Sequence, residues 1–179
     1  LIPKRIKSKK RNFLLPVSRD FLTSMILKLK TELTMEPEIR ILTKKKLVGL
    51  HRTMSLTNNT TRDLWKEFMS RRREVQDVIG AELFSMQIYN AGYFEKFNPD
   101  SDFEKWAAVE VANDFSIPDG MESFVLGDGL YAVFLHTGSA SSGPELFRYI
   151  FGIWLPGSEY TLDHRPHFEI LGEKYKNDD

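Results

Sequence analysis

The chain of 179 residues is long enough for one domain with a substantial core, and its 41% hydrophobic and 28% charged residues are typical of soluble globular proteins. It contains no cysteine, which excludes disulfides, thiolate metal sites and cysteine nucleophiles. No apolar run approaches the roughly 18 residues that a membrane helix needs, so we expect a cytoplasmic protein without membrane contact.

The charges are distributed unevenly along the chain. Residues 1–34 carry nine Lys and Arg against Asp20 and Glu32, a net charge of +7, which leaves −7 for residues 35–179. The basic segment lacks the interleaved aromatic residues of a nucleic-acid platform, so we expect no direct nucleic-acid contact. We interpret residues 1–34 as a disordered extension that folding does not need, with the domain starting at Met35-Glu36-Pro37. A functional basic arm is the alternative interpretation.

The first half of the domain follows the order strand, helix, strand, strand. Apolar alternation and helical spacing predict these elements over residues 39–51, 61–79, 83–89 and 103–111. Three lysines interrupt the first element, which is one bent strand or two. Thr60 and Asp63 are spaced as a variant of the capping box at the start of the helix, and Gly80 ends it.

The second half begins this order again. Strands are predicted over 123–126 and 130–136, a helix over 142–154, and a strand over 165–171. Two strand-helix-strand-strand units predict a pseudo-twofold α+β domain, with two helices on one side of an antiparallel sheet and a ligand cleft on the other. The second unit is one strand short, so we expect that either the sequence is truncated or the last edge strand is absent from it, which would leave a sheet edge unpaired.

Three motifs in the second half carry a resemblance to a known family. They are Tyr131-Ala132-Val133-Phe134-x-His136-x-Gly138, Trp154-Leu155-Pro156-x-Ser158-x-Tyr160 and Arg165-Pro166-x-Phe168-Glu169. Their order and spacing resemble the GyrI-like effector-binding family, whose relatives include effector domains of AraC-type activators and of multidrug-responsive MerR-type regulators. Trp106–Val111, followed by Ile117-Pro118-x-Gly120, is similar to the middle segment of the same family.

Glu169 is the strongest candidate for a ligand-binding group. An ionised carboxylate inside an apolar strand is costly unless a positive or hydrogen-bonding group meets it. Strand alternation separates Glu169 from Phe168 and Ile170, so Glu169 faces the cleft if those two residues pack on the helix.

Five further residues are candidates for the same cleft. Alternation and the resemblance together suggest Tyr89, Trp106, Glu110, Tyr131 and Trp154. Tyr89 and Tyr131 are equally compatible with sheet packing, and Glu110 has an alternative role as an ion-pair partner of Lys105 or Arg165. Such a cleft suits a flat, lipophilic cation. We expect neither a cofactor nor a metal, because His164-x-x-His167 lacks a third ligand.

The resemblance implies two functions that the sequence leaves open. The first is a stand-alone sensor or sequestering protein for small molecules, with a DNA-binding regulator as a protein partner. The second is a hydrolase of strained cyclopropane-bearing compounds, in which Glu169 activates water while Tyr89 or Tyr131 orients it. Inhibition of a topoisomerase rests on the family name alone, and the oligomeric state is left open.

Overall fold

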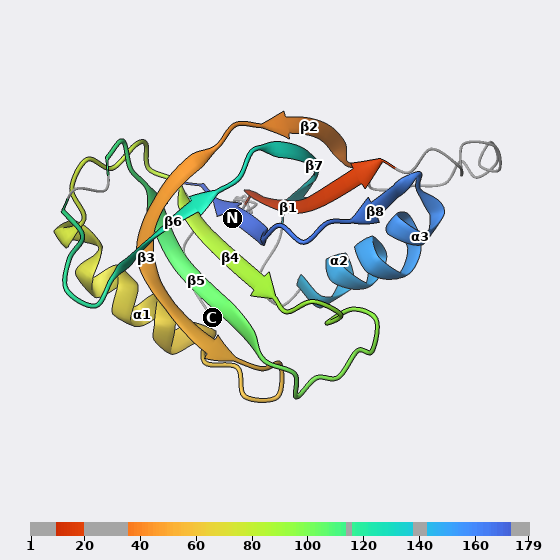
Figure 1. Ribbon diagram of the computed structural model, residues 1–179, viewed down its shortest axis with the longest axis horizontal. Coiled ribbons are helices and arrows are strands. Elements are labelled where there is room, and N and C mark those ends of the chain that lie inside the picture. The colour runs from red at the N-terminus through yellow and green to blue at the C-terminus, as the bar shows by residue number, and fades with distance from the viewer. Residues whose placement is uncertain (1–9, 20–35, 114–115, 138–142, 173–179) are drawn as a thin grey trace, which may run out of the picture.

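The computed structural model describes residues 10–19, 36–113, 116–137 and 143–172 (Figure 1). It confirms the α+β class predicted from the sequence. The strands within these ranges are β1 Lys10–Arg19, β2 Glu38–Leu42, β3 Lys45–Met54, β4 Leu83–Tyr89, β5 Phe103–Glu110, β6 Glu122–Leu126, β7 Gly129–Thr137, β8 Tyr160–Leu162 and β9 His167–Leu171. The helical segments are α1 Thr61–Arg71, the 3₁₀ turn η1 Arg72–Glu74, α2 Gly143–Tyr149, the π-helical η3 Ile150–Trp154 and α3 Leu155–Gly157.

A single curled, antiparallel sheet organises the fold. Its strands follow the order β2-β7-β1-β9-β4-β5-β3-β6, and β8 pairs with β1. The long strand β3 arches along one side of the sheet (Figure 1). Gly49 lets β3 approach β5 closely, because a Cβ at this position would overlap the backbone of Ala107 and Ala108.

The two predicted units are visible in the strand order, and β1 completes the second. In the first unit the third strand, β5, lies between β3 and β4. The corresponding place in the second unit, between β7 and β9, is occupied by β1. The strand β1 therefore occupies the place for which no strand was predicted after residue 171.

This position of β1 differs from the expectation that residues 1–34 form a disordered extension. Phe13, Leu14 and Leu15 are at most 2% exposed and contact the cores on both faces of the sheet. A central strand is buried on both faces and has a continuous apolar run instead of alternation. The basic residues that flank this run concealed it in the sequence.

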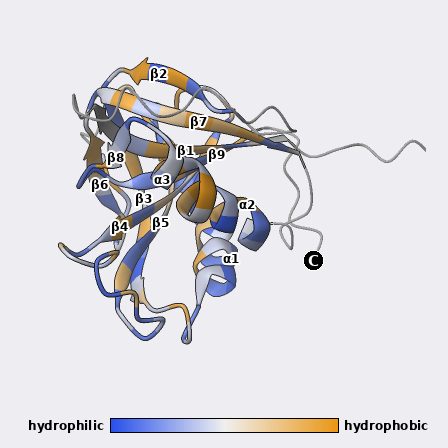
Figure 2. Ribbon diagram, turned by 90° about the vertical axis from the view of Figure 1, so that its right-hand side faces the viewer, coloured by the Kyte–Doolittle hydropathy of each residue, from blue (hydrophilic) through white to orange (hydrophobic). Residues whose placement is uncertain are grey.

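The helices lie on one side of the sheet and cover two separate cores (Figure 2). Leu64 and Phe68 of α1 pack on β3, β4 and β5, while Leu146 and Ile150 pack on β1 and β7. The first helix ends at Arg71 and not near residue 79 as predicted. After the helix, Val75 enters the core under α1 and Asp77 adopts a left-handed φ of 54°. Val78 then pairs with Val111, so this segment follows the sheet and does not continue the helix.

The face away from the helices is a third core and not the ligand cleft that we expected. Because the sheet curls, side chains from both of its ends meet there and fill it. Phe168 is fully buried in this core and Ile170 packs against it. Glu169 consequently points toward the helices, so the two faces of β9 are the reverse of our sequence interpretation.

We expect deletion of residues 1–19 to abolish cooperative folding. Burial of Phe13, Leu14 and Leu15 is worth about 1.5–3 kcal/mol each, a large share of the about 5–15 kcal/mol that stabilises a typical domain. The deletion also leaves the facing edges of β7 and β9 unpaired. Thermal unfolding followed by circular dichroism measures the effect. Deletion of residues 1–9 is the control and should keep a sharp transition; an unshifted transition after deletion of 1–19 would contradict the position of β1.

Candidate functional site

A strip of buried polar side chains crosses the helix side of the sheet where β4 meets β9. The strip comprises Ser85, Gln87, Lys105, His167 and Glu169, and all of these except the half-buried Glu169 are at most 8% exposed. The strand register aligns Glu169 with Ser85 and aligns His167 with Gln87 and Lys105. Buried polar groups are costly and demand partners, so this strip is the first place to seek a site.

Gln87 of β4 connects Lys105 of β5 with His167 of β9. In the amide orientation that satisfies both ends, its oxygen accepts a hydrogen bond from Lys105 Nζ and its nitrogen donates to the His167 carbonyl oxygen at 3.1 Å. Burial lowers the pKa of Lys105 to about 8, and the nearby Glu169 carboxylate opposes this shift. At pH 7 Lys105 is therefore still mostly charged.

His167 in the strip and Tyr89 beside it stay uncharged at neutral pH. Burial lowers the pKa of His167 to about 4, and Asp163 opposes the shift. Burial raises the pKa of Tyr89 far above its ordinary value, with smaller contributions from Tyr93 and Glu169. Neither ring therefore adds a charge to the strip at neutral pH.

Four nearly parallel rings stack next to these groups. The ring centroids of Phe147 and Phe151 are 6.0 Å apart, those of Phe151 and Phe94 are 5.4 Å apart, and those of Phe94 and His167 are 5.3 Å apart. The interplanar angles are 7°, 14° and 17°. Aromatic faces attract both cations and other flat rings, so the stack is a suitable wall for an aromatic cation.

The π-helical segment η3 places Phe151 in this stack. Leu155 donates its N–H to the carbonyl oxygen of Ile150, five residues earlier, which is the hydrogen bond of a π-helix. Pro156 has no N–H, so it cannot donate an α-helical bond to Gly152. The helix is therefore weakly hydrogen-bonded at the point where it presents Phe151.

Two cavities border the stack. The larger, of about 180 Å³, is lined by residues that include Tyr89, Tyr93, Phe94, Asp163, Arg165 and His167. The smaller, of about 20 Å³, is lined by Phe13, His136, Gly143, Leu146, Phe147 and Glu169. His167 Nδ1 and the Tyr93 hydroxyl are buried at the larger cavity without a hydrogen-bond partner in the described part of the chain. These atoms are suited to binding polar groups of a ligand.

The structure places three of the six predicted site residues on the helix side. Glu169 lines the smaller cavity, and Tyr89 lines the larger one and contacts the His167 ring at 5.1 Å. Trp154 packs against Phe134 and Tyr160, with ring centroids 5.1 and 6.0 Å away, and lies outside the lining of both cavities.

The other three predicted residues lie on the opposite face. Tyr131 is fully buried there beneath the guanidinium of Arg165, 4.6 Å from its ring centroid, and Trp106 is 3% exposed. Glu110 forms an ion pair with Lys45 at 2.8 Å, and not with Lys105 or Arg165 as we had suggested. The sheet thus separates Trp106, Tyr131 and Glu110 from Glu169.

Sequence reasoning missed Gln87, Lys105 and the ring stack. Polar residues at alternate positions were the available signal for the first two, because Ser85 and Gln87 interrupt one apolar strand and Lys105 interrupts the next. The stack had no comparable signal. Phe94 lies in the loop after β4, and only the folded chain brings it against Phe151 and His167.

Within the described ranges, no group of three or more His, Asp or Glu side chains is arranged to hold a metal ion. Among the same residues, no helix is both long and apolar enough to span a bilayer.

Comparison with known proteins assigns the family. The GyrI-like small molecule binding domain matches residues 35–179. The chain belongs to this family. It is 29% identical over 130 residues to the transcriptional regulator BrlR of Pseudomonas aeruginosa, an alignment that covers 73% of this chain and 46% of that protein. The chain therefore spans about half the length of this relative.

Two solved structures share the fold of this GyrI-like chain. The structure of SAV2435 bound to tetraphenylphosphonium matches with a TM-score of 0.50 and 17% identity, over 76% of this chain and 92% of that one. A Staphylococcus aureus MU50 protein, described as a candidate bacterial transcription regulation protein, matches with a TM-score of 0.51 and 16% identity, over 76% and 96% of the two chains. At identities of 16–17%, the similarity to these two structures is evidence for a shared fold alone.

Stability should fall as the pH is lowered from about 6.5 to about 4, in part because of His167. The pKa of its ring is lower in the folded protein than in the unfolded chain, so the unfolded chain binds more protons in this interval. The stability that the neutral ring provides is complete above pH 6.5 and is lost as the pH falls, by on the order of 2–3 kcal/mol. Urea unfolding at several pH values should show a shallower pH dependence for His167→Phe, which keeps a ring but does not titrate. Equal slopes in the two proteins would exclude a buried neutral His167.

Proposed function

We propose that this GyrI-like domain binds lipophilic aromatic cations on the helix side of the sheet, and that it senses or sequesters them. The observation that carries the proposal is the position of Glu169, which lines a cavity together with Phe147, the first ring of the stack. A carboxylate beside aromatic rings is suited to a cation that is also lipophilic, because a site that excludes water strengthens both contacts. The tetraphenylphosphonium bound to a protein of the same fold supports this ligand class.

Ligand entry requires the ring stack to move. Cavities for drug-sized ligands are typically about 300–1,000 Å³, larger than either cavity here, of about 180 and 20 Å³. Phe147, at one end of the ring stack, lines the smaller cavity with Glu169, whereas Phe94 and His167 at the other end line the larger cavity. Phe147 and Phe151 both belong to the α2–η3 segment. The π-helical turns make this segment the less costly part of the wall to displace.

A role in transcription follows only by analogy. The relative BrlR is a transcriptional regulator, and this chain corresponds to about half of its length. We therefore propose that ligand binding here is coupled to a DNA-binding regulator, either in the same protein or as a partner.

Glu169→Gln should weaken tetraphenylphosphonium binding by about 10–100-fold, which corresponds to about 1.4–2.8 kcal/mol for a charge-assisted contact. The amide keeps the size of the side chain and removes its charge. Isothermal titration calorimetry measures the change. Glu110→Gln is the matched control, because Glu110 lies on the opposite face with Lys45, and it should bind as the wild type does. A larger loss in Glu110→Gln than in Glu169→Gln would contradict the helix-side site.

The hydrolase function is a second candidate that one observation favours. It needs a carboxylate near a protonated tyrosine, and Glu169 and Tyr89 share the helix side and interact electrostatically. Tyr131 is buried in the core of the opposite face, so we assign this role to Tyr89. Mass spectrometry of a cyclopropane-bearing aromatic compound after incubation distinguishes the two functions. A product with one added water, lost in both Glu169→Gln and Tyr89→Phe, supports hydrolysis, whereas an unchanged compound supports a sensor.

A further inference from the structure

The larger cavity differs from the cavity of Glu169 in its position and its lining. It lies where β4 ends and β9 begins, and its wall includes Tyr93 and Phe94 of the loop after β4 and residues 162–165 before β9. None of the residues that line it also lines the smaller cavity. The two cavities are therefore separate places at which a ligand can bind.

Two buried polar atoms of this lining are unpaired. The Tyr93 hydroxyl and His167 Nδ1 have no hydrogen-bond partner among the residues that the structure describes, and their side chains are 8% and 2% exposed. Burial lowers the pKa of His167 to about 4 and raises that of Tyr93, so both rings are uncharged at neutral pH. A buried polar atom without a partner is costly, and a ligand that pairs with it removes this cost.

Tyr93 and His167 belong to one aromatic cluster. The ring centroid of Tyr89 lies 4.5 Å from that of Tyr93 and 5.1 Å from that of His167. The ring centroid of Phe94 lies 5.1 and 5.3 Å from the same two rings. All four rings line the larger cavity, so its wall combines aromatic surface with two neutral hydrogen-bonding atoms.

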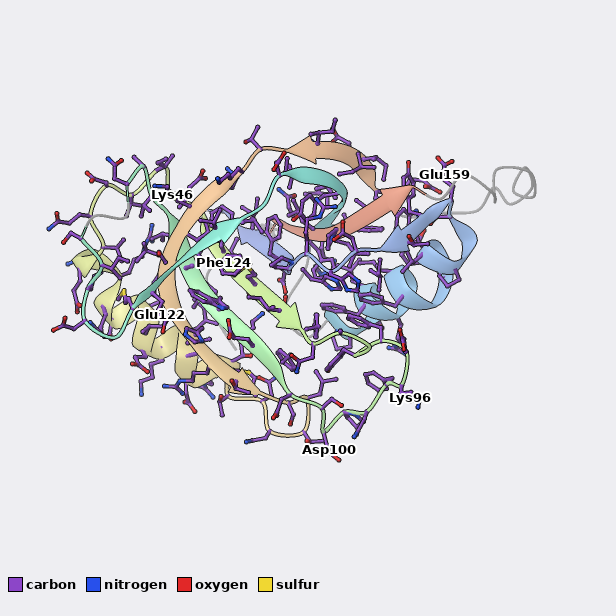
Figure 3. The ribbon with its side chains drawn as sticks, in the orientation of Figure 1. Lys46, Lys96, Asp100, Glu122, Phe124 and Glu159 are labelled. Carbon is purple, nitrogen blue, oxygen red and sulfur yellow. The ribbon has the colours of Figure 1, made fainter. Side chains whose placement is uncertain are left out.

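The charged groups around the cavity do not favour a charged ligand. Arg165 donates two hydrogen bonds of 2.8 Å to Asp163, from its backbone N–H and from Nε, so these two charges neutralise each other. Glu95 and His164 are exposed to water. Lys96 of the same loop is exposed at the outer edge of the protein (Figure 3). The buried part of the lining is therefore suited to an uncharged molecule.

The volume of the cavity limits such a molecule to a single ring. The cavity measures about 180 Å³, well below the about 300–1,000 Å³ that drug-sized ligands require. An apolar cavity of about 150 Å³ is large enough to bind benzene. One ring with a small polar substituent therefore fits without any movement of the wall.

We propose that the larger cavity binds a small uncharged phenol, with its ring against Tyr89 and Phe94 and its hydroxyl bonded to the Tyr93 hydroxyl and His167 Nδ1. A phenol hydroxyl both donates and accepts, so one such group can pair with both atoms. This binding requires neither Glu169 nor displacement of the ring stack, and it is independent of the proposed function.

Titration of the full chain with para-fluorophenol, followed by fluorine NMR at neutral pH, tests this inference. Fluorobenzene is the matched probe, because it has the same ring and lacks the hydroxyl. We expect para-fluorophenol to bind about tenfold more tightly than fluorobenzene, since only the phenol satisfies the two unpaired atoms. Equal affinities for the two probes, or no binding of either, would overturn the inference.

Two variants locate the site. Tyr93→Phe and His167→Phe each keep a ring and remove one unpaired atom, so each should weaken para-fluorophenol by about three- to tenfold without weakening fluorobenzene. Tyr160→Phe is the matched control, because Tyr160 packs on Trp154 outside the cavity lining. Circular dichroism checks that the variants are folded. Wild-type affinity for para-fluorophenol in Tyr93→Phe would contradict the assignment.

Glu169→Gln separates this inference from the proposed function. This variant should bind para-fluorophenol as the wild type does, because Glu169 lines only the smaller cavity. A loss as large as that in Tyr93→Phe would place the phenol beside Glu169 and overturn the inference, while the proposed function would stand. Failure of tetraphenylphosphonium to bind, with normal binding of para-fluorophenol, would overturn the proposed function alone.

Discussion

The pairing of β1 between β7 and β9 is the constraint on which the rest of the structure depends. It joins the half of the sheet under α2 to the half under α1, because β1 pairs with β9 and β9 pairs in turn with β4. The same pairing places Phe13 opposite Glu169 on the helix side, so β1 also forms part of the candidate site. Residues near the N-terminus thus support both the continuity of the sheet and the wall of the smaller cavity. In the second unit, β1 fills the position that β5 has in the first.

The two faces of the sheet differ in the side chains that they bury. The face away from the helices is closed by its own curvature and filled with apolar side chains, among them Trp106, Tyr131 and Phe168. The helix side carries two apolar cores with a polar strip between them, and a strip of this kind does little for stability unless its charges are compensated. Within the strip Gln87 accepts a hydrogen bond from Lys105, and Phe147 lines a cavity together with Glu169.

Much of the fold could be predicted from the sequence because alternation and helical spacing are local signals. The strand over 83–89 has the predicted bounds, both helices are present, and the first unit has the predicted order strand-helix-strand-strand. Alternation separated Glu169 from Phe168 correctly, but it could not decide which face carries the helices. That choice depends on long-range packing, since a curled sheet can bury its other face against itself. The role of β1 was missed for a similar reason. This basic segment forms a central strand only because its backbone pairs with β7 on one side and with β9 on the other.

A crystal structure of the protein with tetraphenylphosphonium is the most direct measurement of where the ligand binds. We expect the phosphonium centre on the helix side beside Glu169, its phenyl rings among those of Phe147 and Phe151, and the α2–η3 segment displaced from its position in the ligand-free protein. A ligand seated on the opposite face against Trp106 and Tyr131, with the ring stack unchanged, would contradict this assignment.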